Sequence, residues 1–242
     1  HASALDQNGL ERLGRIVSSL DADMGVLVDG ESEKISVVDG AGRPVVSDRL
    51  LAFMIELTAK VHKKPVIATQ VRAPYLIERI VKKHKGKLVY TVSNSRSLMT
   101  HVARREKVDF AGDTKGGFIF PDFQPSFAAM VSIMKILELK AAQDLSISQI
   151  NSKIPEVFIE TDTVNCTWEA KGKLMRVLVD KFKSKKMNLT DGIRLNLTKK
   201  KWVLVRPDPT EPKVHVIAEG GDRDEALSLV DEYKQVVEDV SK

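Results

Sequence analysis

The sequence has a single cysteine, Cys166, among its 242 residues. One thiol can form neither an internal disulfide framework nor a multi-cysteine zinc site, and it fits a reducing cytoplasm. The chain also lacks an apolar run of membrane-spanning length, and its first residues lack the basic region and apolar core of a secretory signal. We therefore expect a cytoplasmic protein with no membrane partner.

Aromatic residues are scarce, at 5% of the chain, and the formal net charge is only +5. Three lysine-rich runs, at 82–85, 181–186 and 199–201, are of the kind that neutralises phosphates. Nucleic-acid binding commonly also uses aromatic side chains on which bases stack, and the few aromatics here follow mostly apolar patterns. We therefore expect no nucleic-acid partner.

The most regular stretch runs from residue 191 to residue 220, where alternating apolar residues predict three strands. The loop at 206–212, between the last two strands, has three prolines in seven residues, which predicts a stiff connection. A stiff loop with an arginine, Arg206, and a hydroxyl, Thr210, is suited to bind an oxyanion. The alternative is a tight connection between strands with a surface arginine.

The rest of the chain predicts two domains. Between residues 35 and 142, strand patterns alternate with helical ones, which is typical of an α/β layer structure. A polar joint near residue 143 predicts a boundary, and residues 143–242 predict an antiparallel sheet with helices on one face. The helix at 128–139 carries an apolar stripe that we expect in the core. The residues of this stripe are Met130, Ile133, Met134 and Leu137.

Three carboxylates follow a predicted buried strand at alternate positions: Asp29, Glu31 and Glu33. Alternate residues of an extended backbone share a face, so the three side chains could bind one cation. Carboxylate oxygens suit Mg²⁺ or Ca²⁺. The alternative is a solvated acidic turn.

The segment Asp191-Gly192-Ile193-Arg194, the strand with Trp202 and the loop Arg206-Pro207-Asp208-Pro209-Thr210-Glu211-Pro212 together resemble the C-terminal domain of the α-D-phosphohexomutases, the phosphoglucomutase/phosphomannomutase family. In that family the loop reads Arg-x-Ser-Gly-Thr-Glu-Pro and binds the phosphate of the sugar phosphate. The resemblance implies a phosphate site at Arg206, Asp208 and Thr210. Asp208 replaces the serine and sets a negative charge against phosphate, and Pro209 removes a backbone donor.

The resemblance extends to two earlier loops. Asp29-Gly30-Glu31-Ser32-Glu33-Lys34 is similar to the metal loop Asp-Gly-Asp-x-Asp-Arg, which implies Mg²⁺ at Asp29, Glu31 and Glu33. Two of these side chains are one methylene longer, so we expect weak binding at best. Gly112-Asp113-Thr114-Lys115-Gly116-Gly117 is similar to the sugar-reading loop Gly-Glu-x-Ser-Gly-His, which implies sugar contacts from Asp113 and Lys115.

The resemblance also implies three segments: residues 1–34 as the tail of the family's second domain, 35–142 as its third domain and 143–242 as its C-terminal domain. The family's first domain carries a Thr-Ala-Ser-His-Asn-Pro phosphoserine loop, on which phosphoryl transfer depends. This motif does not occur in the sequence. We therefore assign no catalytic residue.

Three functional hypotheses remain. The first is a catalytically degenerate phosphohexomutase-like module, once shaped to bind a hexose phosphate, that is inactive alone and serves regulation or assembly within a longer polypeptide or a homo-oligomer. The pattern that begins at Cys166, Cys-x-Trp-Glu-x-Lys-Gly-x-x-Met-Arg, resembles modules fused behind a sugar-nucleotidyltransferase. The second is the C-terminal portion of an active phosphohexomutase whose phosphoserine domain has been removed. The third is a plain interaction domain. The start, His1-Ala2-Ser3, also indicates a piece of a longer protein.

Overall fold

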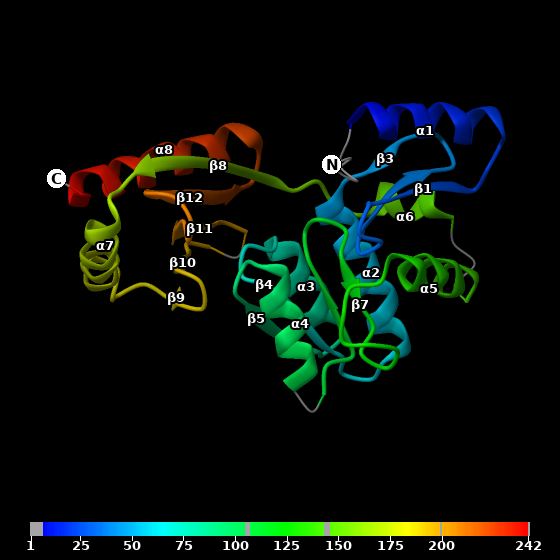
Figure 1. Cartoon of the computed structure of the whole chain (residues 1–242), viewed down its shortest axis with the longest axis horizontal. Helices are drawn as coiled ribbons and strands as arrows, with labels where there is room; N and C mark the ends of the chain where they lie inside the picture. The colour runs from blue at the N-terminus through cyan, green and yellow to red at the C-terminus, as the bar shows by residue number, and fades with distance from the viewer. Residues whose placement is uncertain (1–6, 105–106, 143–145, 199, 242) are drawn as a thin grey trace. The chain divides into compact units, whose positions relative to one another are not determined.

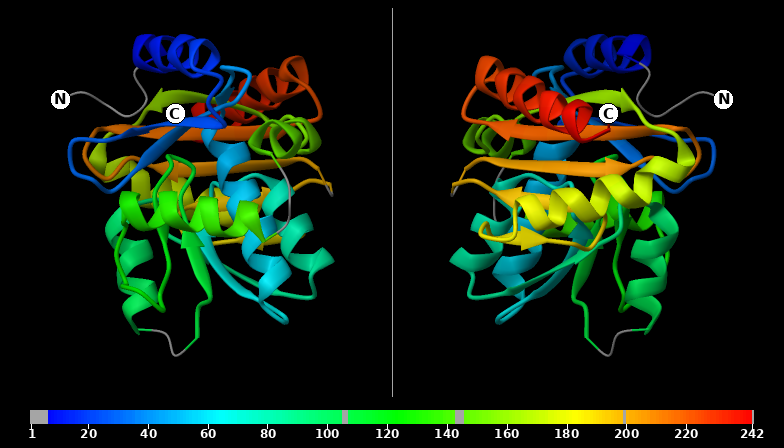
Figure 2. Two further views of the ribbon diagram at one scale, coloured as in Figure 1. Left: turned by 90° about the vertical axis from the view of Figure 1, so that its right-hand side faces the viewer. Right: turned by 90° about the vertical axis from the view of Figure 1, so that its left-hand side faces the viewer.

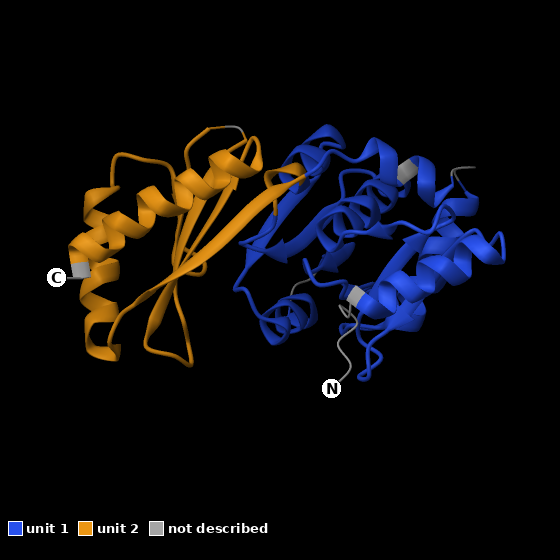
Figure 3. Ribbon diagram, turned by 90° about the horizontal axis from the view of Figure 1, so that it is seen from above, with its two compact units in different colours: residues 1–73, 77–156 blue, residues 74–76, 157–242 orange. Residues whose placement is uncertain are grey.

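The computed structural model describes residues 7–104, 107–142, 146–198 and 200–241 (Figure 1). The chain divides into two compact units, the first of residues 1–73 and 77–156 and the second of residues 74–76 and 157–242 (Figure 3). The boundary predicted at residue 143 falls outside the described residues. The units divide beyond the next helix, α6 (Ile147–Lys153), which belongs to unit 1.

Unit 1 begins with a small antiparallel sheet against which helix α1 (Gln7–Ser19) packs. Gly25 permits the close approach of the helix, because a Cβ there would lie 2.6 Å from a methyl carbon of Val17. The acidic loop at 29–34 connects the first two strands of this sheet. In spatial order the strands are β1 (Met24–Val28), β2 (Ile35–Asp39) and β3 (Pro44–Val45).

A second sheet, with the spatial order β5-β4-β6-β7, forms the centre of unit 1. β4 (Val66–Gln70) is parallel to β5 (Lys87–Thr91) and to β6 (Phe110–Gly112), whereas β7 (Phe118–Ile119) is antiparallel to β6. Parallel neighbours need crossover connections, and helices supply them here. These helices are α3 (Tyr75–Lys83), between β4 and β5, and α4 (Ser95–Arg104), between β5 and β6. The arrangement confirms the predicted α/β class.

Two further helices complete unit 1, α2 (Ser47–Val61) and α5 (Ala129–Ala141). α2 is buried along most of its length, as its run of apolar residues from Leu50 to Ile55 requires. None of the described helices is both long and apolar enough to cross a bilayer.

The predicted burial of the methionine stripe of α5 is wrong. Met130, Met134 and Leu137 are 62%, 54% and 48% exposed, and Ile133 is only half-buried. α5 is apolar on more than one face, so helical spacing alone fits two orientations. The face that packs inward carries Ala129, Val131, Ser132, Ile136 and Leu139.

Unit 2 is one antiparallel sheet with the spatial order β8-β12-β11-β10-β9. Alternate residues of its strands, among them Val203, Val205, Val214 and Val216, point into a core closed by two helices. Both helices lie in front of the sheet in the right-hand view of Figure 2, which agrees with the prediction of helices on one face. The elements are β8 (Phe158–Asn165), α7 (Trp168–Lys181), β9 (Met187–Asn188), β10 (Ile193–Asn196), β11 (Trp202–Pro207), β12 (Lys213–Gly220) and α8 (Arg223–Ser241).

Candidate phosphate, sugar and metal loops

The loop between β11 and β12 is organised by Asp208. Its Oδ1 accepts hydrogen bonds from the backbone N–H of Thr210 at 2.8 Å, from the Thr210 hydroxyl at 3.0 Å and from the backbone N–H of Glu211 at 2.8 Å. Its Oδ2 lies 2.6 Å from Nε2 of His215 on β12. The carboxylate is therefore turned into the loop, and Asp208 is only 8% exposed.

These contacts change how Asp208 acts. The sequence predicts a charge that opposes phosphate from the loop surface, whereas the carboxylate instead lies among the loop's own donors. The His215 contact first, and the Thr210 backbone N–H next, hold the pKa of Asp208 well below its usual range. An ionised carboxylate thus occupies donors of the kind that an oxyanion would use.

Lys171 of α7 anchors the same loop from behind. Its Nζ donates to the backbone carbonyls of Asp208, at 2.6 Å, and Glu211, at 2.5 Å, and it lies 3.6 Å from the centre of the Trp168 ring. The residue is 8% exposed, which is rare for lysine. Lys171 was not predicted as a loop residue, although it is the lysine of the pattern that begins at Cys166. That pattern is the signal in the sequence from which a role of Lys171 could have been predicted.

Arg206, at the start of the loop, does not contact Asp208 in any described hydrogen bond. Its Nη1 lies 3.9 Å from Oδ2 of Asp191, and its Nε is buried and has no hydrogen-bond partner among the described residues. A guanidinium with an unused donor retains capacity for an anion. Of the predicted phosphate ligands, Thr210 and Asp208 bond to each other, and among the described residues Arg206 forms no hydrogen bond with either.

The predicted sugar loop follows β6 in unit 1. Oδ1 of Asp113 accepts from the backbone N–H of Lys115 at 2.8 Å and of Gly117 at 2.9 Å, and its Oδ2 is buried with no hydrogen-bond partner among the described residues. Lys115 is exposed. Gly116 has φ +85°, and a Cβ there would lie 2.1 Å from the Ile35 carbonyl oxygen, so the turn requires glycine.

Gly117 stands where the family's loop carries histidine, and its surroundings leave no room for a side chain. A Cβ on Gly117 would lie 2.9 Å from two ring carbons of Phe127. Asp113 is one methylene shorter than the glutamate of the family's loop. It closes the turn because its carboxylate accepts hydrogen bonds from amides of the loop itself. The turn differs from a sugar-reading loop in both of these residues.

The predicted metal loop is a hairpin turn closed by Asp29. Its Oδ1 accepts from the backbone N–H of Glu33 at 2.8 Å and of Lys34 at 3.0 Å. Glu31 is exposed, and among the described residues no three His, Cys, Asp or Glu side chains are grouped to hold a metal ion. In this arrangement the three carboxylates do not fit a Mg²⁺ site, and Mg²⁺ binding there stays a prediction.

The structure brings the metal loop and the sugar loop together. The backbone N–H of Ile35 donates to the carbonyl of Gly116 at 3.0 Å, and Lys34 and Gly117 form an isolated β-bridge. Both loops belong to unit 1, whereas the phosphate loop belongs to unit 2.

A half-buried carboxylate in the first turn of α2, Asp48, was not predicted as a functional residue. Burial raises the pKa of Asp48 to about 6, although the charge of Arg72 acts in the opposite direction. Its Oδ1 is buried without a hydrogen-bond partner among the described residues. From the sequence, Asp48 reads only as a residue near a helix cap.

Comparison with known proteins supports the relationship along the chain. A family model described as phosphoglucomutase/phosphomannomutase, alpha/beta/alpha domain III, matches residues 46–158. A probable phosphoglucosamine mutase of Methanopyrus kandleri is 28% identical over 94% of this chain and 50% of its own length. A phosphoglucosamine/phosphogalactosamine mutase of Sulfurisphaera tokodaii is 28% identical over 96% of this chain and 51% of its own length. The chain spans about half the length of the curated relatives it matches.

Solved structures agree in fold. A phosphoglucomutase/phosphomannomutase family protein from Burkholderia thailandensis superposes with a TM-score of 0.83 at 19% identity, over 99% of this chain and 52% of that one. Aspergillus fumigatus N-acetylphosphoglucosamine mutase, solved with GlcNAc-6P and magnesium, gives a TM-score of 0.61 at 16% identity over 89% of this chain and 52% of that one. Residues 46–158 match domain III of the phosphoglucomutase/phosphomannomutase family, and these findings together support the α-D-phosphohexomutase family, C-terminal part, for the chain.

Proposed function

We propose that this chain is a phosphohexomutase-like module that has no mutase turnover alone and serves regulation or assembly within a longer polypeptide or a homo-oligomer. The observation that carries the proposal is the inward carboxylate of Asp208. It already bonds to two amides, a hydroxyl and an imidazole, so a sugar phosphate has to displace an anion that the fold satisfies. The missing phosphoserine motif supports the same conclusion.

Turnover is the direct test. The chain is incubated with glucose 1-phosphate, mannose 1-phosphate or glucosamine 6-phosphate, together with Mg²⁺ and the matching hexose bisphosphate. We expect no product above a buffer control. Turnover that follows the protein through purification would contradict the proposal.

A second candidate is the C-terminal portion of an active phosphohexomutase. Two observations favour it: the chain aligns over nearly its whole length with about half of each relative, and the TM-score of 0.83 extends over both units. The test adds, as a separate polypeptide, the part of the Methanopyrus kandleri relative that lies outside the match. Restored turnover favours this candidate, and association without turnover favours the module. Absence of hexose phosphate binding in every form leaves a plain interaction domain.

The site residues proposed for ligands are Arg206, Asp208 and Thr210 for phosphate and Asp113 and Lys115 for sugar. The relative solved with GlcNAc-6P and magnesium supports hexose phosphate and Mg²⁺ as the ligands to examine first. The closed turn around Asp29 supports, for this chain, only weak Mg²⁺ binding at Asp29, Glu31 and Glu33.

A further inference from the structure

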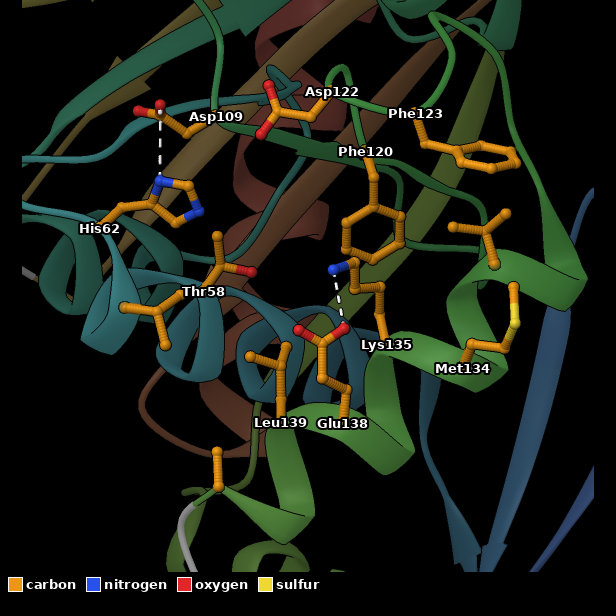
Figure 4. A pocket seen from close by; sticks show the side chains of 13 residues that line it. Thr58, His62, Asp109, Phe120, Asp122, Phe123, Met134, Lys135, Glu138 and Leu139 are labelled. Atoms are coloured by element: carbon orange, nitrogen blue, oxygen red, sulfur yellow. Dashed lines mark hydrogen bonds and ion pairs between the residues drawn. The ribbon is translucent and has the colours of Figure 1, made fainter.

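Unit 1 contains a cavity of about 540 Å³ that none of the three loops uses. It lies between the C-terminal end of α2, helix α5 and the segment after β7 (Figure 4). Asp109, immediately before β6, lines the cavity, whereas Asp113 of the predicted sugar loop follows the other end of the same strand. The cavity is therefore at the opposite end of β6 from that loop. Its volume is in the range of small-molecule sites.

The apolar lining comes from two sources. Phe120 and Leu139 are 8% and 6% exposed and form the buried part, while Phe123 and Met134 are 63% and 54% exposed at the rim. Figure 4 shows the rings of Phe120 and Phe123 beside each other, with Met134 on the facing helix. Exposed aromatic and thioether groups around one cavity indicate a ligand with an apolar part.

The charges of the lining are mainly negative. Asp109 accepts from the backbone N–H of Val66 at 2.7 Å and lies 3.6 Å from Nδ1 of His62. Glu138 pairs with Lys135 at 2.7 Å. Asp122 lines the cavity too, and it forms no ion pair or hydrogen bond with the described residues.

The position of Asp122 indicates where in the cavity a cation would bind. It lies in sequence between the two aromatic residues, Phe120 and Phe123, and Figure 4 shows its carboxylate on the side of Asp109, with the ring of Phe123 directed the other way. Two carboxylates on one side of the cavity, of which that of Asp122 is unpaired, attract a cation by direct Coulombic interaction. An anionic ligand, in contrast, would meet three carboxylates and a lysine that is already paired.

We propose that this cavity binds an organic cation, a protonated amine on an apolar stem. The stem packs against Phe120, Leu139 and Met134, and the ammonium group lies at Asp122. A free alkylamine and a lysine side chain of a polypeptide both have this chemistry.

The test measures binding to the whole chain by titration calorimetry and NMR. The probes are n-hexylammonium, n-hexanoate, n-hexanol and a short acetylated peptide with one lysine between two leucines. We expect n-hexylammonium to bind at least about tenfold more tightly than n-hexanoate, and more tightly than n-hexanol. Tighter binding of the free amine identifies a small-molecule ligand, and tighter binding of the peptide identifies a polypeptide.

The exposed position of Asp122 provides a variant that leaves the core unchanged. Asp122→Asn should weaken n-hexylammonium binding by about twofold to fivefold, the size of an exposed ion pair. Asp224→Asn, an exposed acid on α8 in unit 2, is the matched control and should bind as the parent does. The proposal is overturned if no amine binds, if n-hexanoate binds as tightly, or if the control variant weakens binding equally.

Discussion

Oδ2 of Asp208 lies 2.6 Å from Nε2 of His215, one strand further along the chain. This contact, together with three donors from Thr210 and Glu211, points the carboxylate inward. The sequence predicts that the charge of Asp208 repels phosphate from the loop surface. In the folded chain its carboxylate instead accepts hydrogen bonds from its own loop. The loop keeps its shape without a bound anion because it carries one of its own.

The double variant Asp208→Ser with Pro209→Gly should bind inorganic phosphate about tenfold or more tightly than the parent. It frees the Thr210 and Glu211 amides and adds a backbone donor whose net contribution is about 1 kcal/mol. Titration calorimetry measures the affinity, and Pro209→Gly alone, which keeps the carboxylate, is the control. Equal phosphate affinity in parent and double variant would show that Asp208 does not compete with the ligand.

Lys171→Met should lower the free energy of unfolding by about 2 kcal/mol. The buried ammonium satisfies two carbonyl groups of the phosphate loop, and its loss leaves both without that donor. Chemical denaturation measures the change. Lys173→Met, at an exposed position of the same helix, should change stability little. Similar losses in the two variants would contradict the anchoring role.

The contribution of Asp48 to the free energy of unfolding should fall as the pH rises from about 4 to about 6. Its folded pKa, about 6, is above the ordinary value of 3.8, so the folded state holds the proton longer than the unfolded state does. The stabilisation that protonation provides is fully present at pH values below the ordinary pKa. It is lost as the pH rises through the pKa of the folded state. Asp48→Asn should therefore unfold at a higher temperature at pH 7.5, with a gain of at most about 3 kcal/mol.

At pH 3.5 the carboxyl group of Asp48 is largely protonated in both the folded and the unfolded state. The same comparison should therefore show little difference in stability between Asp48→Asn and the parent. Asp224→Asn is the control, since Asp224 is exposed. A stability gain that is equal at both pH values would indicate a packing effect and not a titration.

Gly117→Ala should destabilise unit 1 by about 1–3 kcal/mol, because its Cβ would meet the Phe127 ring at 2.9 Å. The matched control is Gly172→Ala on α7, where a Cβ meets nothing within 4 Å and where alanine should stabilise the helix by about 0.5–1 kcal/mol. Thermal unfolding of both variants checks the pair. A neutral Gly117→Ala would mean that the loop has room for the family's histidine after all.

Mg²⁺ should bind the hairpin turn at Asp29 weakly, because one carboxylate oxygen already accepts two backbone hydrogen bonds. Calorimetry with Mg²⁺ and Mn²⁺ measures the affinity, and Glu31→Gln should leave it nearly unchanged. A tight site that Glu31→Gln abolishes would show that the three carboxylates rearrange around the ion.

Local patterns were sufficient for the class and order of the elements. Apolar residues with periods of two and 3.6 predict the alternating strands and helices of unit 1 and the antiparallel sheet of unit 2, since each element needs one face to bury. The same patterns carry motifs such as Arg206 to Pro212, from which the family relationship could be predicted. Periodicity failed to predict the buried face of α5, because residues on two faces of this helix are apolar. Only packing against the rest of unit 1 selects the face of Ala129 and Ile136.

The direction of single side chains depends on partners that are distant in the sequence. Asp208 turns inward because His215 comes beside it when β11 pairs with β12. Lys171 reaches the loop from a helix 37 residues earlier. A carboxylate has the same composition whether it repels an anion or replaces one, and the donors that surround it in the folded chain determine which of these it does.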